Sequence, residues 1–239
     1  MDVKKGTLYG IGVGPGDPEW MTVKAVRLLA ACRHVCVPRS AADSDSVALQ
    51  IAERYLRPDV IVHELPFPMT SDTEVLRQHW RQAAGTVHEI LSGGEDCCFL
   101  TLGDALLYST YIYLLRELKS LDPTMQAVTV PGVTAFSAAA ALCNRAVGEG
   151  KQWVTVVPAS DDFDQFSSAL DRGGTVVLMK IGRRLERVLD ELETRSLLDQ
   201  AVFVSHAGLP QQHVETDVRR LRGLPDKTGY LSILIVSVL

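Results

Sequence analysis

Short apolar runs alternate with longer amphipathic segments along the first half of the chain. The apolar runs predict four strands, at 7–13, 34–38, 60–65 and 96–102. Segments with helical spacing of apolar residues predict helices at 17–32, 44–57, 71–91 and 108–118. Ser71 and Glu74 have the spacing of a capping box at the start of the third helix. This alternation of strand and helix predicts a mainly parallel, doubly wound sheet.

The second half of the chain has a less regular pattern. A turn-rich break at 120–124 (SLDPT) precedes it. Apolar runs then predict strands at 127–130, 153–157, 175–180, 201–205 and 230–239, with helices at 134–142 and 183–195. We therefore expect two α/β domains, residues 1–120 with a mainly parallel sheet and residues 121–239 with a mixed sheet.

Composition narrows the class of protein. With 46% hydrophobic and 22% charged residues, the 239-residue chain matches ordinary globular proteins and can bury a substantial core. A net charge of -5 and scattered basic residues argue against a nucleic-acid partner. The chain has neither the long apolar run of a membrane span nor the apolar stretch of a signal peptide, so we expect a cytoplasmic protein without membrane contact.

Cysteine and histidine spacing bears on metals and disulfides. The cysteines are odd in number, lie mostly in apolar segments and form no CxxC pair, which predicts reduced, buried thiols: Cys32, Cys36, Cys97, Cys98 and Cys143. The histidines show no ligand spacing, so no protein metal site is predicted. Among them only His206 lies near the expected ligand cleft.

A glycine-rich turn, GIGVGPGD at 10–17, joins the first predicted strand to the first helix. That position is typical of a dinucleotide fingerprint, but the GxGxxG spacing is absent and no acidic residue ends the second strand. The lysine and Ser/Thr of a P-loop are absent as well. Its residues alone indicate either a tight structural turn or a close approach of backbone to a ligand.

Two more strand ends carry glycine. Gly103 and Asp104 follow the fourth strand, and the segment 131–134 follows the fifth. Open α/β sheets bind ligands at such carboxyl ends, and a following helix N-terminus offers free N–H groups. Asp104 either binds a ribose or a cationic group or caps the next helix, and Thr134 is either part of the ligand site or only an N-cap. Together the three turns predict one small-molecule cleft between the domains.

The same three segments resemble those of the tetrapyrrole methylases. The family pattern GxGPGDPxxxT stands here as Gly12 to Thr22, the GD motif as Gly103-Asp104, and VPGVT(S/A) as Val130 to Ala135. Their order and spacing match along essentially the whole chain. The stretches 67–72 (FPMTSD), 101–115 and 177–180 resemble most the members that methylate carbon-20 of precorrin-2 or cobalt-factor II. The chain has LGDAL where the uroporphyrinogen-methylating relatives usually have GGDPF.

This resemblance implies the fold of the class III methyltransferases, a homodimer, and S-adenosylmethionine as cofactor between the two domains. It implies cofactor contacts, chiefly through backbone, at Gly103, Asp104, Leu107, Tyr108, Ser109, Thr110, Val133, Thr134, Met179, Ala207 and Leu209. It also implies that the first turn faces a trough for the tetrapyrrole. Expected substrate contacts in that turn are therefore Gly14, Pro15, Gly16 and Asp17. Arg39 is expected as well, because the substrate carries many carboxylates that basic side chains would bind.

Methyl transfer from a sulfonium requires little from the protein beyond alignment and exclusion of water. One proton must later leave the methylated carbon, so a single general base or a water suffices. Candidates for catalytic help are Asp104, Lys180 and Tyr230, with Asp104 as a binder before a base. Lys180 pairs with a substrate carboxylate or merely ends a strand, and Tyr230 is a site residue or an aromatic at the edge of the core.

Three other functions stay open at this point. One is methylation of a different position, at carbon-11, carbon-17 or on the uroporphyrinogen ring. Another is a nucleotide-binding regulatory protein built on the glycine turn. The third is a non-catalytic subunit, against which the intact motifs argue.

Overall fold

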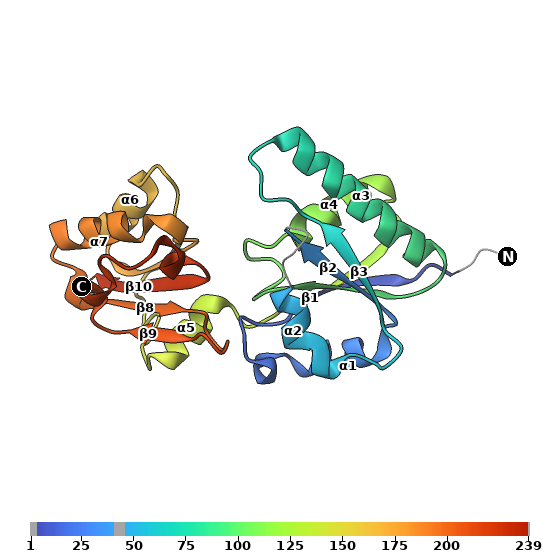
Figure 1. The fold of residues 1–239 in the computed structure, drawn as a ribbon, viewed down its shortest axis with the longest axis horizontal. Helices are drawn as coiled ribbons and strands as arrows, with labels where there is room; N and C mark the ends of the chain where they lie inside the picture. The colour runs from blue at the N-terminus through green and yellow to red at the C-terminus, as the bar shows by residue number, and fades with distance from the viewer. Residues whose placement is uncertain (1–3, 41–45, 239) are drawn as a thin grey trace. The chain divides into compact units, whose positions relative to one another are not determined.

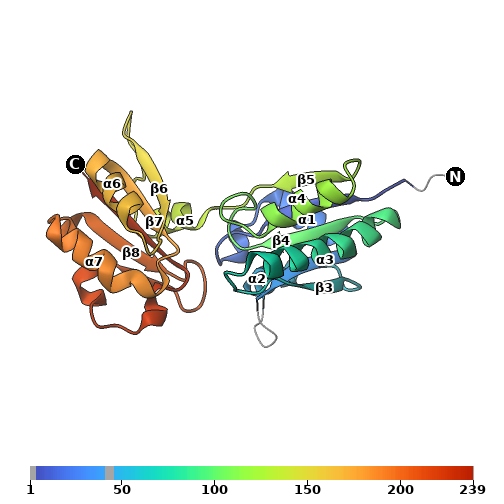
Figure 2. The ribbon, with the colours of Figure 1, turned by 90° about the horizontal axis from the view of Figure 1, so that it is seen from above.

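The computed structural model describes residues 4–40 and 46–238. The chain forms two compact units, Met1–Thr134 and Ala135–Leu239. Each unit has its own sheet and its own apolar core (Figures 1 and 2).

The first unit contains a five-stranded sheet in the order β3-β2-β4-β1-β5, with every pairing parallel. Its strands are β1 (Thr7–Gly12), β2 (His34–Arg39), β3 (Ile61–Pro66), β4 (Cys97–Thr101) and β5 (Gln126–Val130). The connecting helices are α1 (Val23–Ala31), α2 (Val47–Ala52), α3 (Thr73–Ser92) and α4 (Tyr111–Leu121). Figure 1 shows α3 and α4 over one face and α1 and α2 over the other. The predicted doubly wound sheet is confirmed.

The middle strand of this sheet is β4, and all five of its residues are buried. Parallel strands covered on both faces read as continuous apolar runs, which is the pattern its sequence has. On the α3/α4 face, Phe99 packs with Leu91 and Leu114.

Two helix starts differ from the expected ones. Asp72, not Ser71, caps α3, because its carboxylate accepts hydrogen bonds from the N–H groups of Glu74 and Val75. The helix predicted from residue 17 is divided: Asp17 caps only a 3₁₀ turn, Pro18–Trp20, and Met21 is extended. The helix then restarts because the Thr22 hydroxyl accepts from the Ala25 N–H.

The second unit has a mixed five-stranded sheet in the order β6-β7-β10-β8-β9. Only β6 and β7 pair in parallel, and β10 is antiparallel to both of its neighbours. The strands are β6 (Val154–Pro158), β7 (Gly174–Met179), β8 (Ala201–Ser205), β9 (His213–Glu215) and β10 (Ser232–Val238). The expectation of a mixed second sheet is confirmed.

Helices α6 (Asp164–Arg172) and α7 (Leu185–Thr194) supply the apolar core on one face of this sheet, where Phe166 and Leu189 join Phe203. Helix α5 (Ala135–Leu142) packs against β10. Just beyond it, Arg145 Nε donates to Ser237 Oγ at 3.3 Å. Neither α6 nor β9 was expected from the sequence pattern, and β10 begins at Ser232, two residues after the predicted start.

The two units meet in sequence after Thr134, beyond the break at 120–124. That break separates α4 from β5, and β5 belongs to the first sheet because it pairs with β1 from Thr7↔Gln126 to Ile11↔Val130. All three glycine turns therefore lie in the first unit, apart from Ala135 at the end of the third.

All five cysteines are free thiols, and four of them are buried. Cys36 Sγ lies 3.3 Å from Cys97 Sγ, and this hydrogen bond together with burial raises the pKa of Cys97. Within the described ranges, no helix is long and apolar enough to cross a membrane.

Candidate active site

Three glycine turns meet where β1, β4 and β5 end, and we call this surface, formed by Gly12, Gly103 and Gly132, the glycine edge. A Cβ atom on Gly132 would lie 2.2 Å from Gly103 O and 2.7 Å from Gly12 O. Gly14 and Gly103 also exchange two backbone hydrogen bonds, of 3.1 and 2.8 Å. The three turns therefore meet within the first unit, and their close approach depends on the absence of side chains. The expected cleft between the domains stays a prediction.

Asp104 ties two of these turns together. Its Oδ1 accepts from the Leu106 N–H at 2.9 Å, and its Oδ2 accepts from the Gly132 N–H at 3.0 Å. The carboxylate therefore holds its own loop and the β5 turn in one arrangement. It does not cap α4, which begins at Tyr111.

A layer of buried hydroxyl groups supports the loop 102–110 from below. Ser109 is only 5% exposed, is hydrogen-bonded to Thr101 Oγ1 at 2.8 Å, and accepts from the Tyr111 N–H at 3.1 Å. The Tyr111 ring lies directly under Gly10, and its hydroxyl is 3.3 Å from Thr129 Oγ1. Burial raises the pKa of that hydroxyl. The Ser109 side chain thus points into the protein, so any ligand contact at this residue involves its backbone.

Large apolar side chains are exposed on the segments that leave the carboxyl ends of β1, β3 and β4. Val23 is 87% exposed, Met69 83%, Leu106 55% and Tyr108 43%. Apolar side chains gathered at one edge of a sheet are typical of a surface that another molecule covers.

The expected substrate contacts also lie at this edge and differ in burial and in their partners. Gly14, Pro15 and Gly16 are buried, and Asp17 is half-buried with its Oδ1 accepting from the Glu19 N–H. Arg39 ends β2 and forms an ion pair with Glu64 of β3.

Two of the expected cofactor contacts follow β5. Val133 and Thr134 are half-buried and directly precede α5.

The second unit has its own group of adjoining strand ends. Lys180 follows β7, His206 follows β8, and Leu231 precedes the antiparallel β10 that lies between them. The His206 N–H donates to Leu231 O at 2.9 Å. A Cβ atom on Gly229 would lie 1.9 Å from Gly182 O, so the segments around β7 and β10 touch as well.

The backbone is strained at these strand ends. Six described residues other than glycine have positive φ. Two of them, Asn144 and Ser196, lie just past the ends of α5 and α7, where a left-handed residue is ordinary. The other four lie in loops beside strand ends: Tyr108 (φ 52°) in the first unit, and Lys180 (60°), His206 (52°) and Leu231 (46°) in the second. Such strain costs about 1–3 kcal/mol per residue and is concentrated at functional sites.

We call the surface formed by Lys180, His206, Leu231 and the adjacent Tyr230 the strained edge. The polar ends of Lys180, Tyr230 and His206 have no hydrogen-bonding partner in the described part of the chain. The rings of His206 and Tyr230 lie 6.0 Å apart, and burial lowers the pKa of His206. Of the other expected residues, Met179 and Ala207 are buried and Leu209 is half-buried next to them.

The sequence pattern identified Lys180 and Tyr230 but gave no role to His206 or Leu231. Leucine carries no local signal for a left-handed backbone, and histidine has only the weak preference that it shares with asparagine and aspartate. Only the pairing of three strands at one edge makes the cluster visible.

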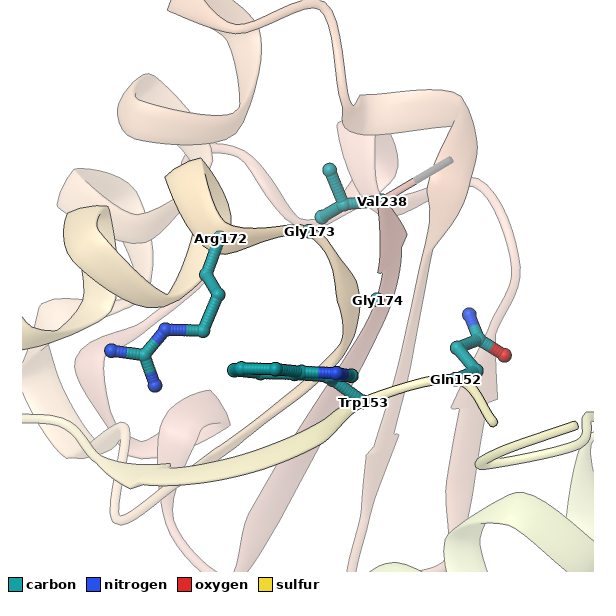
Figure 3. A pocket seen from close by; sticks show the side chains of 6 residues that line it. All are labelled: Gln152, Trp153, Arg172, Gly173, Gly174 and Val238. Atoms are coloured by element: carbon teal, nitrogen blue, oxygen red, sulfur yellow. The ribbon is translucent and has the colours of Figure 1, made fainter. Parts of the chain in front are cut away.

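A hollow of about 320 Å³ lies at the opposite end of the second sheet (Figure 3). Its walls include Trp153 and Arg172, whose guanidinium carbon is 5.7 Å from a ring centroid of Trp153. None of the expected site residues lines this hollow. Among residues 4–40 and 46–238, no group of three or more His, Cys, Asp or Glu side chains is placed to hold a metal ion.

Comparison with known proteins gives consistent matches. The family Tetrapyrrole (Corrin/Porphyrin) Methylases matches residues 7–221. The chain is 33% identical over 235 residues to a cobalt-precorrin-2 C(20)-methyltransferase of Salmonella typhimurium, covering 97% of this chain and 96% of the relative.

The chain is also 34% identical over 218 residues to the cobalamin biosynthesis protein CobIJ of Mycobacterium tuberculosis. That match covers 88% of this chain, which spans only 42% of the length of CobIJ. Among solved structures, a uroporphyrin-III C-methyl transferase from Thermus thermophilus complexed with S-adenyl homocysteine superposes with a TM-score of 0.65 at 21% identity, covering 97% of each chain.

Proposed function

The chain belongs to the tetrapyrrole methylase family, and from this premise we propose that it transfers a methyl group from S-adenosylmethionine to carbon-20 of precorrin-2 or its cobalt-bearing counterpart. The choice of carbon follows the full-length relative named for C(20) methylation. The cofactor follows the family and the neighbour complexed with S-adenyl homocysteine.

The single observation that carries the proposal is the glycine edge. Gly12 and Gly132 are closed by backbone contact, whereas a Cβ atom on Gly103 would meet nothing within 4 Å. With φ of +72°, Gly103 leaves its backbone open on that side. Bare backbone at the carboxyl ends of three adjoining strands fits a nucleoside-like cofactor that is bound mainly through main-chain groups. The residues present therefore fit the cofactor.

In this scheme, the backbone of Gly103, Tyr108 and Val133 would hold the cofactor. When bound, the cofactor supplies an electrophilic methyl group on a sulfonium. The protein's part is to fix the loop 102–110, which Asp104 and Ser109 do through four hydrogen bonds of 2.8 to 3.1 Å. A loop that is fixed in advance loses little entropy when it aligns the reacting atoms.

The exposed apolar side chains would cover the macrocycle and exclude water from the reacting carbon. The Lys180 ammonium, which has no partner among the described residues, is available for a substrate carboxylate. Arg39 would have to exchange its contact with Glu64 for such a carboxylate.

We further propose that the protein works as a homodimer in the cytoplasm, a compartment that suits five free thiols.

The test is an anaerobic incubation with isotopically labelled S-adenosylmethionine and precorrin-2, with and without cobalt. We expect the mass of the product to rise by one labelled methyl group, which NMR then assigns to carbon-20. A methyl group on carbon-11 or carbon-17 would make this chain a different member of the family. Calorimetric binding of NAD or ATP without any methylated product would favour the nucleotide-binding alternative.

A further inference from the structure

The hollow of about 320 Å³ beside Trp153 belongs wholly to the second unit and has no part in the proposed function. We propose that it binds a small, flat aromatic carboxylate. The ring of this ligand stacks on Trp153, and its carboxylate is held by the guanidinium of Arg172. The inference is independent of methyl transfer and uses residues of one unit only.

The walls of the hollow come from the ends of three neighbouring strands. Trp153 directly precedes β6, Gly173 directly precedes β7, and Val238 ends β10. A Cβ atom on Gly173 would meet only Val238 O, at 3.9 Å, and the positive φ of 77° suits a residue without one. The glycine therefore keeps this wall bare. The volume is at the lower end of the range for small-molecule sites, about 300–1,000 Å³, which suits a ligand of one or two rings.

Trp153 is exposed to an unusual degree for so large an apolar side chain, at 63%. Its ring lies beside Arg172, whose guanidinium carbon is 5.7 Å from a ring centroid (Figure 3). Arg172 also occupies the last turn of α6, where a cation stabilises the helix end. That role explains the charge but not the exposed indole next to it. A flat ligand on the indole would remove apolar surface from water and retain the cation at its edge.

The side chains that line the hollow offer hydrogen-bond donors. The Arg172 guanidinium forms no ion pair with a described residue, and the Trp153 Nε1–H forms no hydrogen bond with one. Gln152 Oε1 accepts from the Glu149 N–H at 3.3 Å, which leaves its Nε2 free to donate. Donors of this kind require an acceptor-rich ligand, and a carboxylate matches the fork of a guanidinium. The apolar walls add the requirement for an aromatic ring, which a bare phosphate would not meet.

The probe is 2-naphthoate, titrated into the whole chain by calorimetry and followed by NMR of the tryptophan indole N–H groups. The chain has three tryptophans, Trp20, Trp80 and Trp153, and the signal of Trp153 is identified by its loss in Trp153→Leu. We expect 2-naphthoate to shift this signal and leave the other two in place. A cation of similar shape, 2-naphthylmethylammonium, should not bind, because Arg172 repels it.

Arg172→Met keeps the alkyl stem and removes the charge. We expect the affinity for 2-naphthoate to fall by about tenfold or more, since a charge-assisted pair is lost. The matched control is Arg187→Met, which removes another arginine of the same unit. The Arg187 guanidinium carbon lies 4.1 Å from the ring centroid of Phe163, away from the hollow, so this variant should bind as the wild type does.

Two further variants separate charge from space. Gln152→Glu keeps an acceptor for the Glu149 N–H but adds a negative charge, so 2-naphthoate should bind more weakly. Val238→Phe fills the hollow without removing a polar group and should abolish binding. Thermal unfolding checks that each variant is folded.

The proposal is wrong if 2-naphthoate leaves the Trp153 signal in place, or if the cation binds as tightly as the carboxylate. Both results come from the wild type and do not depend on the folding of a variant. Equal affinities of Arg172→Met and Arg187→Met would also overturn it. If Trp153→Leu converts an oligomer to monomers in analytical ultracentrifugation, the surface is a contact between copies of this chain and not a ligand site.

Discussion

The glycine edge and the strained edge lie at strand ends in the two units, but they are built in opposite ways. At the glycine edge, backbone touches backbone, and the polar side chains of Asp104 and Ser109 are fully engaged within the protein. At the strained edge, Lys180, His206 and Leu231 hold unfavourable backbone conformations, and the polar groups of Lys180 and His206 are left without partners in the described chain. The first edge is organised to bind by shape and the second to present side chains.

This difference makes separate predictions for mutations. At the glycine edge, an added or removed atom should disturb stability and binding together. At the strained edge, a change should leave the fold intact, or even improve it, while activity falls.

The largest effect should come from Gly132→Ala. The new Cβ would lie 2.2 Å from Gly103 O, a backbone atom that cannot rotate away. We expect the free energy of unfolding to fall by about 3 kcal/mol, together with loss of S-adenosylhomocysteine binding. Denaturant unfolding and calorimetry measure the two effects.

Gly85→Ala is the matched control for this change. Gly85 lies within α3, and a Cβ there would meet nothing within 4 Å, so the variant should gain about 1 kcal/mol of stability from helix propensity. Equal behaviour of the two alanine variants would mean that the glycine edge is not closed as described.

The next effect in size should come from Asp104→Ala. The change leaves the N–H groups of Leu106 and Gly132 without their acceptor, at a cost of about 1–3 kcal/mol. We expect the affinity for S-adenosylhomocysteine to fall by about tenfold or more, because the loop and the β5 turn lose their link. Asp104→Asn, which keeps one acceptor oxygen, should fall between alanine and the wild type. An alanine variant with unchanged affinity would contradict the role assigned to this carboxylate.

A smaller effect, of opposite sign, is expected for Lys180→Gly. Glycine relieves the strain of a φ of 60°, so the free energy of unfolding should rise by about 1 kcal/mol. The KM for the tetrapyrrole should rise as well, since the ammonium is lost. Thermal unfolding and steady-state kinetics on the same samples separate the two changes. A Lys180→Gly variant that is less stable and fully active would contradict the claim that changes at the strained edge lower activity and leave the fold intact.

The smallest effect should be a dependence of stability on pH. Burial lowers the pKa values of His63 in the first unit and His206 in the second. The unfolded chain therefore binds protons more readily than the folded one, and stability should fall as pH drops below about 6.5. His63→Gln should reduce this loss between about pH 7.5 and about pH 5.5 when unfolding is measured by denaturant. An unchanged slope would exclude His63 as a contributor.

The sequence predicted the first unit well because its signals are local. The buried run of β4 and the glycine turns require only neighbouring residues to be recognised, and the resemblance of the turns to a known family extended the prediction to the site. One failure is local. Asp72 and Ser71 are both acceptable caps, and Asp72 is the one that accepts from the Glu74 and Val75 N–H groups.

The remaining differences depend on contacts between residues that are distant in the sequence. The break at 120–124 has the turn residues of a domain boundary, yet β5 beyond it completes the first sheet by pairing with β1. The pairing of Arg39 with Glu64 follows from the register of β2 on β3, which places Val37 opposite Glu64. The hydrogen bond from the His206 N–H to Leu231 O joins residues that are separated by two 3₁₀ turns and the short strand β9.

Because the Tyr111 ring packs against Gly10, the residue types allowed at these two positions depend on each other during evolution. A methyl group on residue 10 would lie 2.1 Å from the ring carbon Cζ, so residue 10 cannot gain a side chain while residue 111 is a tyrosine. In a library randomised at both codons, survivors with alanine at position 10 should carry a smaller residue at position 111. The order in which such changes arise then matters, because the ring must shrink before the glycine can be replaced.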